Sequence, residues 1–292
     1  VYSCSGAAAG DTTQVLSGPS LAVTTNSGFG VSTATGNALS LTSSSGITFT
    51  DTHASTITGA EKGIRAVNSS AGSVSITTTG AVTGNSSNGI FAVNNGNGTL
   101  SVTATGPVTG KVGDGIRAYN HPVGQGTLTV TAGSVAGQSR GIFAVNRGSG
   151  TLSVTSTGTV TGTTSDGIFT RAHTLTDATV TVSNSSVTGA TNGIDTYHVV
   201  AGTNAINVSG TVIGGTGDGI RTRTAVGGSS LVTLNSGANI SAASGTAISN
   251  NAGNSTVSVN GGAIVTGAIS LGDGADNLIF DGGSFATVTT LD

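Results

Sequence analysis

The sequence contains one cysteine, three prolines, no tryptophan and no methionine among its 292 residues. A single cysteine, Cys4, cannot form a disulfide within the chain, so no internal disulfide framework supports the fold. Charged residues make up only 7% of the chain, and the net charge is −3. The chain therefore lacks the overall positive charge that is typical of nucleic-acid-binding proteins, and we expect no nucleic-acid partner. The sequence also has no run of about 18 apolar residues, the length that a membrane-spanning helix needs.

Glycine, by contrast, occurs 49 times, and the mean hydropathy is +0.20. Val, Ile and Leu recur along the whole chain among Ser, Thr and Asn, which favours many short strands joined by glycine-rich turns. The absence of methionine indicates a processed part of a longer product from which a signal peptide has been removed. Sparse cysteine fits passage through an oxidising compartment, so we expect an extracellular protein.

The strongest pattern is an internal repeat of 26 residues. The dipeptide Gly-Ile recurs at this interval seven times, from Gly63-Ile64 to Gly219-Ile220. Each unit continues with an apolar pair, such as Val74 and Ile76, and then with a Val-x-Gly motif, such as 82–84. One unit therefore reads as three short strands with period-2 alternation, separated by Gly, Asn and Ser turns.

Three strands per unit without helical periodicity predict an all-β fold, a right-handed parallel β-helix with one coil per 26-residue repeat. A single coil cannot bury its apolar side chains, whereas coils stacked about 4.8 Å apart bury them in one continuous column. We expect residues 1–27 to form an N-terminal cap or lead-in and residues 28–292 to form the β-helix. The regular coils are expected at 63–245.

The strand that begins at each Gly-Ile pair predicts a column of stacked amides. Alternation turns the isoleucine and the fifth residue of the strand inward. That fifth residue is asparagine in four consecutive units, and amides stacked at strand spacing can hydrogen-bond along a ladder. The expected ladder consists of Asn68, Asn94, Asn120 and Asn146.

The outward positions of the same strand collect residue types that are scarce elsewhere. Two outward columns hold five of the seven arginines and five of the ten aromatic residues. Such columns can simply stabilise neighbouring strands, or they can form a contact surface for a glycan or protein, because Arg, Tyr and Phe are enriched in interfaces. We favour the contact surface. This candidate binding face consists of Arg65, Phe91, Arg117, Tyr119, Phe143, Phe169, Arg171, Tyr197, Arg221 and Arg223.

Catalysis is the main alternative, because β-helices also carry lyases and glycosidases that use clustered carboxylates. Here no coil has two acids in its strands: Asp177 and Asp195 are isolated. We assign Asp114, Asp166 and Asp218, which each precede a Gly-Ile pair, to turns that tolerate positive φ. No nucleophile, nucleotide or zinc motif is present. We therefore predict a protein that is not an enzyme and needs no cofactor.

Two features could suggest a metal ion. His121, His173 and His198 follow the outward columns, and we interpret them as surface residues. The segment 272–278 partly matches the calcium-binding nonapeptide repeat, but such sites share ligands between successive copies, and only one copy is present. We predict no metal site.

The coils, together with the closing segment 271–283 (LGDGADNLIFDGG), resemble the passenger domains of AIDA-like autotransporters (type V secretion) common in alpha-proteobacteria. The resemblance extends from residue 28 to the end and is specific for architecture and secretion route. It implies a C-terminal outer-membrane β-barrel in the full-length protein as the passenger's own partner. It also implies that the chain is secreted or lies on the outer-membrane surface of a Gram-negative bacterium.

The same resemblance implies two alternative functions. Many such passengers are adhesins and virulence factors that bind a host-cell receptor or surface glycan along the rod. Some, in Bartonella-type bacteria, are released and act as soluble ligands of a host receptor, including proangiogenic mimics of a growth factor. For a released ligand we expect a compact patch from Arg117 to Arg171. The sequence leaves both alternatives open.

Overall fold

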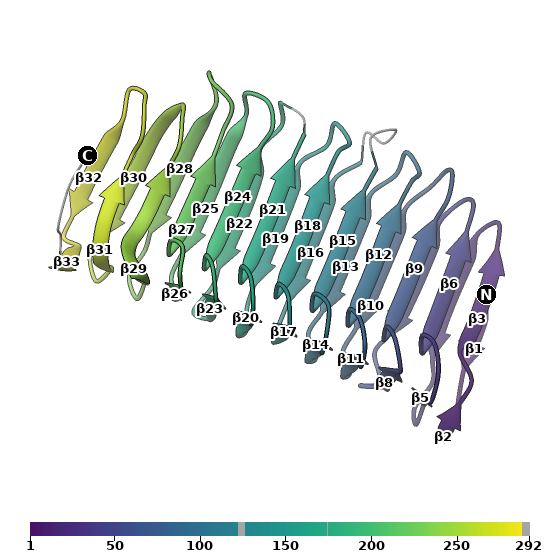
Figure 1. Cartoon of the computed structure of the whole chain (residues 1–292). Coiled ribbons are helices and arrows are strands. Elements are labelled where there is room, and N and C mark those ends of the chain that lie inside the picture. Colours follow the sequence, from purple (N-terminus) through teal and green to yellow (C-terminus); the bar gives the residue numbers. More distant parts are fainter. Residues whose placement is uncertain (122–125, 174, 288–292) are drawn as a thin grey trace.

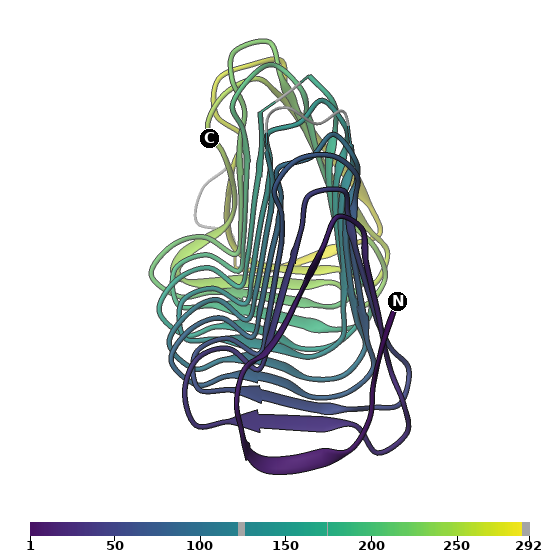
Figure 2. The same cartoon turned by 90° about the vertical axis from the view of Figure 1, so that its right-hand side faces the viewer.

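The structure, a computed structural model, describes residues 1–121, 126–173 and 175–287, and every regular element in these ranges is a β-strand. Residues 288–292 of the expected β-helix lie outside the described residues. The strands pair in parallel from coil to coil and build a solenoid with the first and last described strands at its two ends (Figure 1). Viewed along the stack, the bends of successive coils superpose (Figure 2). The predicted all-β parallel β-helix is confirmed.

The first side of the solenoid is a 12-stranded parallel sheet, which we call the twelve-strand ladder. Its strands contain the apolar pair of each repeat, and their register runs from one end to the other without a bulge, as in the pairing of Val74 with Leu100. Its strands are β1 (Tyr2–Cys4), β4 (Leu21–Thr25), β7 (Ile47–Asp51), β10 (Val74–Thr78), β13 (Leu100–Ala104), β16 (Leu128–Ala132), β19 (Leu152–Ser156), β22 (Ala178–Val182), β25 (Thr203–Val208), β28 (Ser229–Leu234), β30 (Asn254–Asn260) and β32 (Asn277–Asp281).

On the second side, each strand of the regular coils begins at the isoleucine of a Gly-Ile pair, and we call this side the Gly-Ile ladder. Ile90 pairs with Ile64 on one side and with Ile116 on the other, so the 26-residue sequence repeat is also the structural repeat. Its strands are β3 (Gln14–Gly18), β6 (Leu39–Ser43), β9 (Ile64–Asn68), β12 (Ile90–Asn94), β15 (Ile116–Asn120), β18 (Ile142–Asn146), β21 (Ile168–Ala172), β24 (Ile194–His198) and β27 (Ile220–Arg223), followed by the end of β29 (Asn239–Asn250) and by β31 (Ile264–Ser270).

The third side, the Val-x-Gly ladder, has shorter strands. It joins the Gly-Ile ladder in one 21-stranded sheet, because β29 and β31 each run through both ladders. Its other strands are β2 (Ala7–Asp11), β5 (Gly30–Thr33), β8 (Thr56–Gly59), β11 (Val82–Gly84), β14 (Val108–Gly110), β17 (Val135–Gly137), β20 (Val160–Gly162), β23 (Ser186–Gly189), β26 (Thr211–Gly214) and β33 (Ser284–Thr287).

The core is a continuous column between the three ladders. Ile64, Ile116 and Ile194 each have 0% exposure, and burying one such side chain contributes about 1.5–3 kcal/mol relative to leaving it in water. In β22 the inward positions continue as Ala178 and Val180, which pair with Leu152 and Val154.

Residues 1–27, expected as a cap or lead-in, are already part of the ladders. Tyr2 pairs in parallel with Val23, and Gln14 pairs with Leu39. The segment therefore forms the first coil and covers the N-terminal end of the buried core.

The glycines of the repeat are required by space and not by backbone conformation. None of the Gly-Ile or Val-x-Gly glycines from Gly63 to Gly219 has positive φ, and neither have Asp114, Asp166 and Asp218, so these corners form without the positive φ that we expected. A Cβ on Gly84 would lie 2.0 Å from the carbonyl oxygen of Asn88. The short strand and the following strand therefore meet at a corner too tight for any side chain.

Candidate functional site: an arginine–aromatic face

The candidate binding face lies on the outer side of the Gly-Ile ladder. Along β15 and β21 buried and half-buried residues alternate, and the half-buried ones are those of the face. They are half-buried because each covers its neighbour in the next coil, whereas Arg221 near the end is exposed. In register, Arg117 lies between Phe91 and Phe143. The structure therefore brings the predicted residues together in two columns, which are interrupted by Asp195 after Phe169 and by Val145 after Tyr119.

Two stacked phenylalanines form the centre of this face. The rings of Phe143 and Phe169 lie 5.3 Å apart at an angle of 7°. The guanidinium of Arg117 lies 4.4 Å from the centre of the Phe143 ring. Arg140 lies 5.1 and 5.0 Å from the two ring centres. The aromatic pair is thus framed by two cations, each contact contributing about 0.5–1 kcal/mol at an exposed site.

The second outward column repeats this arrangement with tyrosines. The Arg147 guanidinium lies 5.3 Å from the Tyr119 ring. Tyr197 lies between Arg171, at 5.1 Å, and Arg223, at 4.8 Å. Because a stacked guanidinium has fewer accessible rotamers, these arginines are held against the surface in defined positions.

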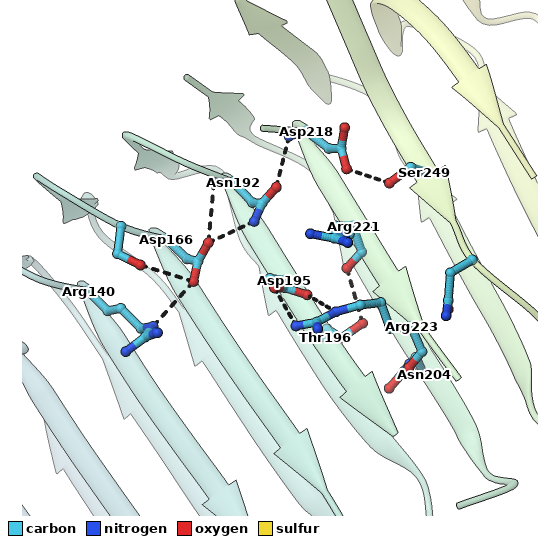
Figure 3. Close-up of polar contacts among 12 residues, drawn as sticks. Arg140, Asp166, Asn192, Asp195, Thr196, Asn204, Asp218, Arg221, Arg223 and Ser249 are labelled. Carbon is cyan, nitrogen blue, oxygen red and sulfur yellow. Dashed lines mark hydrogen bonds and ion pairs between the residues drawn. The ribbon is translucent and has the colours of Figure 1, made fainter. Parts of the chain in front are cut away.

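Carboxylates at the edge of the ladder hold two of the central arginines. Asp114, which is 3% exposed, accepts a hydrogen bond from Arg117 at 3.1 Å. Asp166, which is 4% exposed, accepts one from Arg140 at 3.2 Å (Figure 3). Each carboxylate is buried and its arginine is partly exposed, so the face presents the cation and hides the anion.

Asp195, which we predicted to lie apart from other acids, forms an ion pair with an arginine. It occupies an outward position but is 4% exposed, because Arg223 of the next coil covers it. The Arg223 guanidinium contacts both carboxylate oxygens, at 3.0 and 2.6 Å (Figure 3). Burial raises the pKa of Asp195, and this effect exceeds the opposing influence of the Arg223 charge.

The residues before each Gly-Ile pair form a second polar ladder that we did not predict. The amide oxygen of Asn88 accepts the backbone N–H of Asp114 in the next coil at 2.8 Å. Asn192 donates its side-chain N–H to Asp166 at 2.8 Å and accepts the backbone N–H of Asp218 at 2.8 Å (Figure 3). These side chains satisfy backbone groups at the corner where the strands of two ladders meet.

The asparagine column consists of two bonded pairs. The Asn68 side-chain N–H donates to the Asn94 oxygen at 2.8 Å, and Asn120 donates to Asn146 at 3.0 Å. Asn94 turns its own N–H to the carbonyl of Gly98, at 2.9 Å. No hydrogen bond joins Asn94 to Asn120 within the described residues. All four amides are buried, so the column contributes to the stability of the coils and not to the outer face.

The histidines are placed differently from our expectation of surface residues. His198 has 0% exposure and continues the inward asparagine column. His121 and His173 are half-buried at the corner beyond the strands. Burial lowers the pKa of His173, and the positive charges of Arg171 and Arg147 lower it further. Among the described residues, no three His, Cys, Asp or Glu side chains gather where they could hold a metal ion.

Three cations of the site were missing from the predicted set. Lys62 lies 5.8 Å from the Phe91 ring, and Arg140 and Arg147 stack on rings as described above. They are in turns, which we excluded by considering only strand positions. Aligning the turn residues on the same 26-residue interval would have found them.

No helix in the described part of the chain is long and apolar enough to cross a membrane. No protein-family model matches the chain, and comparison with curated proteins and with solved structures yields no match either.

Proposed function

We propose that this chain is the passenger of an autotransporter, secreted or displayed on the outer surface of a Gram-negative bacterium. In this proposal it binds molecules of a host-cell surface as an adhesin. The binding site is the candidate binding face, extended by the turn cations Lys62, Arg140 and Arg147. The proposal assigns no catalytic step to the chain.

One observation carries the proposal: arginines and aromatic rings are concentrated and pre-positioned on a single face. The outer side of the twelve-strand ladder carries mainly threonine and serine, such as Thr103 and Thr131. By contrast, Phe143 and Phe169 stack in parallel, with Arg117 next to the Phe143 ring and Arg140 next to both rings. Rigid aromatic groups flanked by arginine are typical of the residues that dominate binding energy at interfaces.

The test compares binding of purified variants to cultured epithelial and endothelial cells. We expect Phe143→Ala/Phe169→Ala to weaken binding at least about tenfold, which corresponds to about 1.4 kcal/mol. The matched control is Thr103→Ala/Thr131→Ala, two register partners in adjacent coils of the twelve-strand ladder. Circular dichroism establishes that both variants keep their strands. Equal binding by the wild type and the folded phenylalanine variant would overturn the assignment of this face.

A second candidate function is that of a released, soluble ligand of a host receptor. The observation that favours it is the compactness of the central cluster, in which Arg117, Arg140, Phe143 and Phe169 lie within three successive coils. Activation of a receptor by the soluble chain, with a response that saturates as the chain concentration rises, supports this candidate. Attachment of cells only to the immobilised chain supports the adhesin.

A further inference from the structure

The positive charges of this chain are concentrated on one side of the solenoid. Eight of its nine lysine and arginine residues lie in the strands of the Gly-Ile ladder or within two residues of their ends. Lys111, in the turn after β14, is the exception. We call the eight the cation stripe: Lys62, Arg65, Arg117, Arg140, Arg147, Arg171, Arg221 and Arg223.

Few acidic residues lie beside this stripe at the surface. Only four of the 12 acidic residues lie in the same segments. Three of them, Asp114, Asp166 and Asp195, are at most 4% exposed, and each is paired with one arginine. Asp218, the fourth, accepts a hydrogen bond from Ser249. The side therefore presents positive charge although the whole chain carries −3.

Five members of the stripe have no ion-pair partner within the part of the chain that the structure describes. Arg147 and Arg171 are the most defined of these, because each is stacked on a tyrosine ring. The Arg171 Nε atom is buried without a hydrogen-bond partner among the described residues. The members without an ion pair are Lys62, Arg65, Arg147, Arg171 and Arg221.

His121 and His173 lie beside these two arginines. Backbone hydrogen bonds place His121, Arg147 and His173 at the same position of three successive coils. Burial lowers the pKa of His173, and the nearby charges of Arg171 and Arg147 lower it further. An anion placed there would meet two guanidinium groups and two imidazole rings.

We propose that the cation stripe binds a linear sulfated polysaccharide of the glycosaminoglycan type. This inference rests on the proposed function and names the ligand class of the same face. From β9 to β27 the stripe spans six coil steps, or about 29 Å at strand spacing. It runs along an open, regular surface, and guanidinium groups bind the oxygens of sulfate and carboxylate in a two-contact geometry.

The ring contacts favour a polysaccharide over a single-stranded nucleic acid. Nucleic-acid strands bind by stacking their bases on exposed aromatic faces. In this chain Phe143 is stacked against Phe169 and covered by Arg117, and Tyr197 lies between Arg171 and Arg223. The rings position the cations and leave little aromatic surface for bases.

The first test measures binding of the purified chain to immobilised heparin at increasing salt. We expect binding that weakens with salt, and a loss on the order of tenfold for Arg147→Gln/Arg171→Gln. The matched control is Lys111→Gln, which removes the cation outside the stripe and should bind as the wild type does. Arg147→Lys/Arg171→Lys keeps both charges and should retain more binding than the glutamine variant. Circular dichroism and thermal unfolding establish that all variants are folded.

Three results would overturn the inference: no heparin binding by the wild type, equal weakening by Lys111→Gln, or equal competition by chemically desulfated heparin. Equal competition by double-stranded DNA would also overturn it, because the face would then bind any polyanion.

Cell binding separates this inference from the proposed function. Removal of sulfated glycosaminoglycans from cells with heparin lyases should reduce binding of the wild type to the level of the glutamine variant. If the wild type binds treated and untreated cells equally, the polysaccharide is excluded as the ligand while the adhesin proposal stands. If the chain binds heparin but no cells, the polysaccharide site stands and the adhesin proposal is wrong.

Discussion

Asp195 and Arg223 form a two-contact ion pair across adjacent coils, with N–O distances of 3.0 and 2.6 Å. The carboxylate is 4% exposed, and the same guanidinium stacks on Tyr197. Burial raises the pKa of Asp195 in spite of this partner. The ionised carboxylate is therefore tolerated in the fold because Arg223 compensates part of its desolvation.

Replacing Arg223 should show how far the stability of the fold depends on this ion pair. In Arg223→Gln the buried carboxylate loses its cation, and we expect the free energy of unfolding at pH 7 to fall by about 2 kcal/mol. This is less than for a fully buried pair, because the Arg223 side chain is 25% exposed. Denaturant unfolding followed by circular dichroism measures the change.

The pH dependence of this variant has a defined sign. A pKa raised in the folded state means that folding favours the protonated acid, so stability falls as pH rises from the unfolded to the folded pKa. Arg223→Gln should therefore regain stability as the pH is lowered from 7 toward the ordinary range of aspartate. Asp195→Asn/Arg223→Gln should lack this gain. A loss in Arg223→Gln that is the same at every pH would contradict the explanation.

Asp51 is the opposite case, a buried carboxylate that has no ion-pair partner among the residues that the structure describes. It has 0% exposure and accepts hydrogen bonds from the hydroxyls of Thr25, Ser55 and Thr78 at 2.7, 2.7 and 3.1 Å. Burial alone would raise its pKa, but the hydrogen bonds, including one from the backbone N–H of His53, lower the pKa to about 2. The carboxylate thereby joins β4, β7 and β10 at the N-terminal end of the stack.

We expect Asp51 to make the fold sensitive to acid. Because the pKa is lowered on folding, its contribution is present above the ordinary aspartate pKa and is lost as the pH falls toward 2. The loss should be about 2 kcal/mol. Asp51→Asn should be less stable than the wild type at pH 7 and should show a smaller decrease in unfolding free energy between pH 5 and about 2. Asp177→Asn, at an exposed acid, serves as the control and should behave as the wild type.

The two asparagine pairs should differ in their importance. Asn94 accepts bonds from Asn68 and from the backbone of Gly96, and it donates to Gly98. The oxygen of Asn120 has no hydrogen-bond partner among the described residues. Asn94→Ala should thus lower the free energy of unfolding by about 2 kcal/mol and Asn120→Ala by about 1 kcal/mol. Chemical unfolding of the two variants checks this order, and the reverse order would contradict it.

The sequence predicts the fold well and the site only in part, for one physical reason. Inward positions follow strict alternation, so the buried column at Ile64 and Asn68 could be read directly from the 26-residue interval. The role of an outward or turn residue depends on which side chain of the next coil reaches it. The covering of Asp195 by Arg223 and the stacking of Arg140 on two phenylalanines follow from rotamers, which alternation does not specify.

Glycine positions give the most direct test of how the coils stack. A Cβ on Gly89 would lie 2.6 Å from a methyl carbon of Val108 and 2.8 Å from the carbonyl oxygen of Gly115 in the next coil. Neither group can move without displacing a ladder strand, so Gly89→Ala should cost about 3 kcal/mol. Since each coil contacts only its neighbours, hydrogen exchange should rise mainly in β12 and β15 and much less at the two ends. Gly261→Ala is the matched control, because its Cβ would come no closer than 3.6 Å to any neighbour. If both alanine variants have the same free energy of unfolding as the wild type, the close approach of the coils at Gly89 does not require glycine.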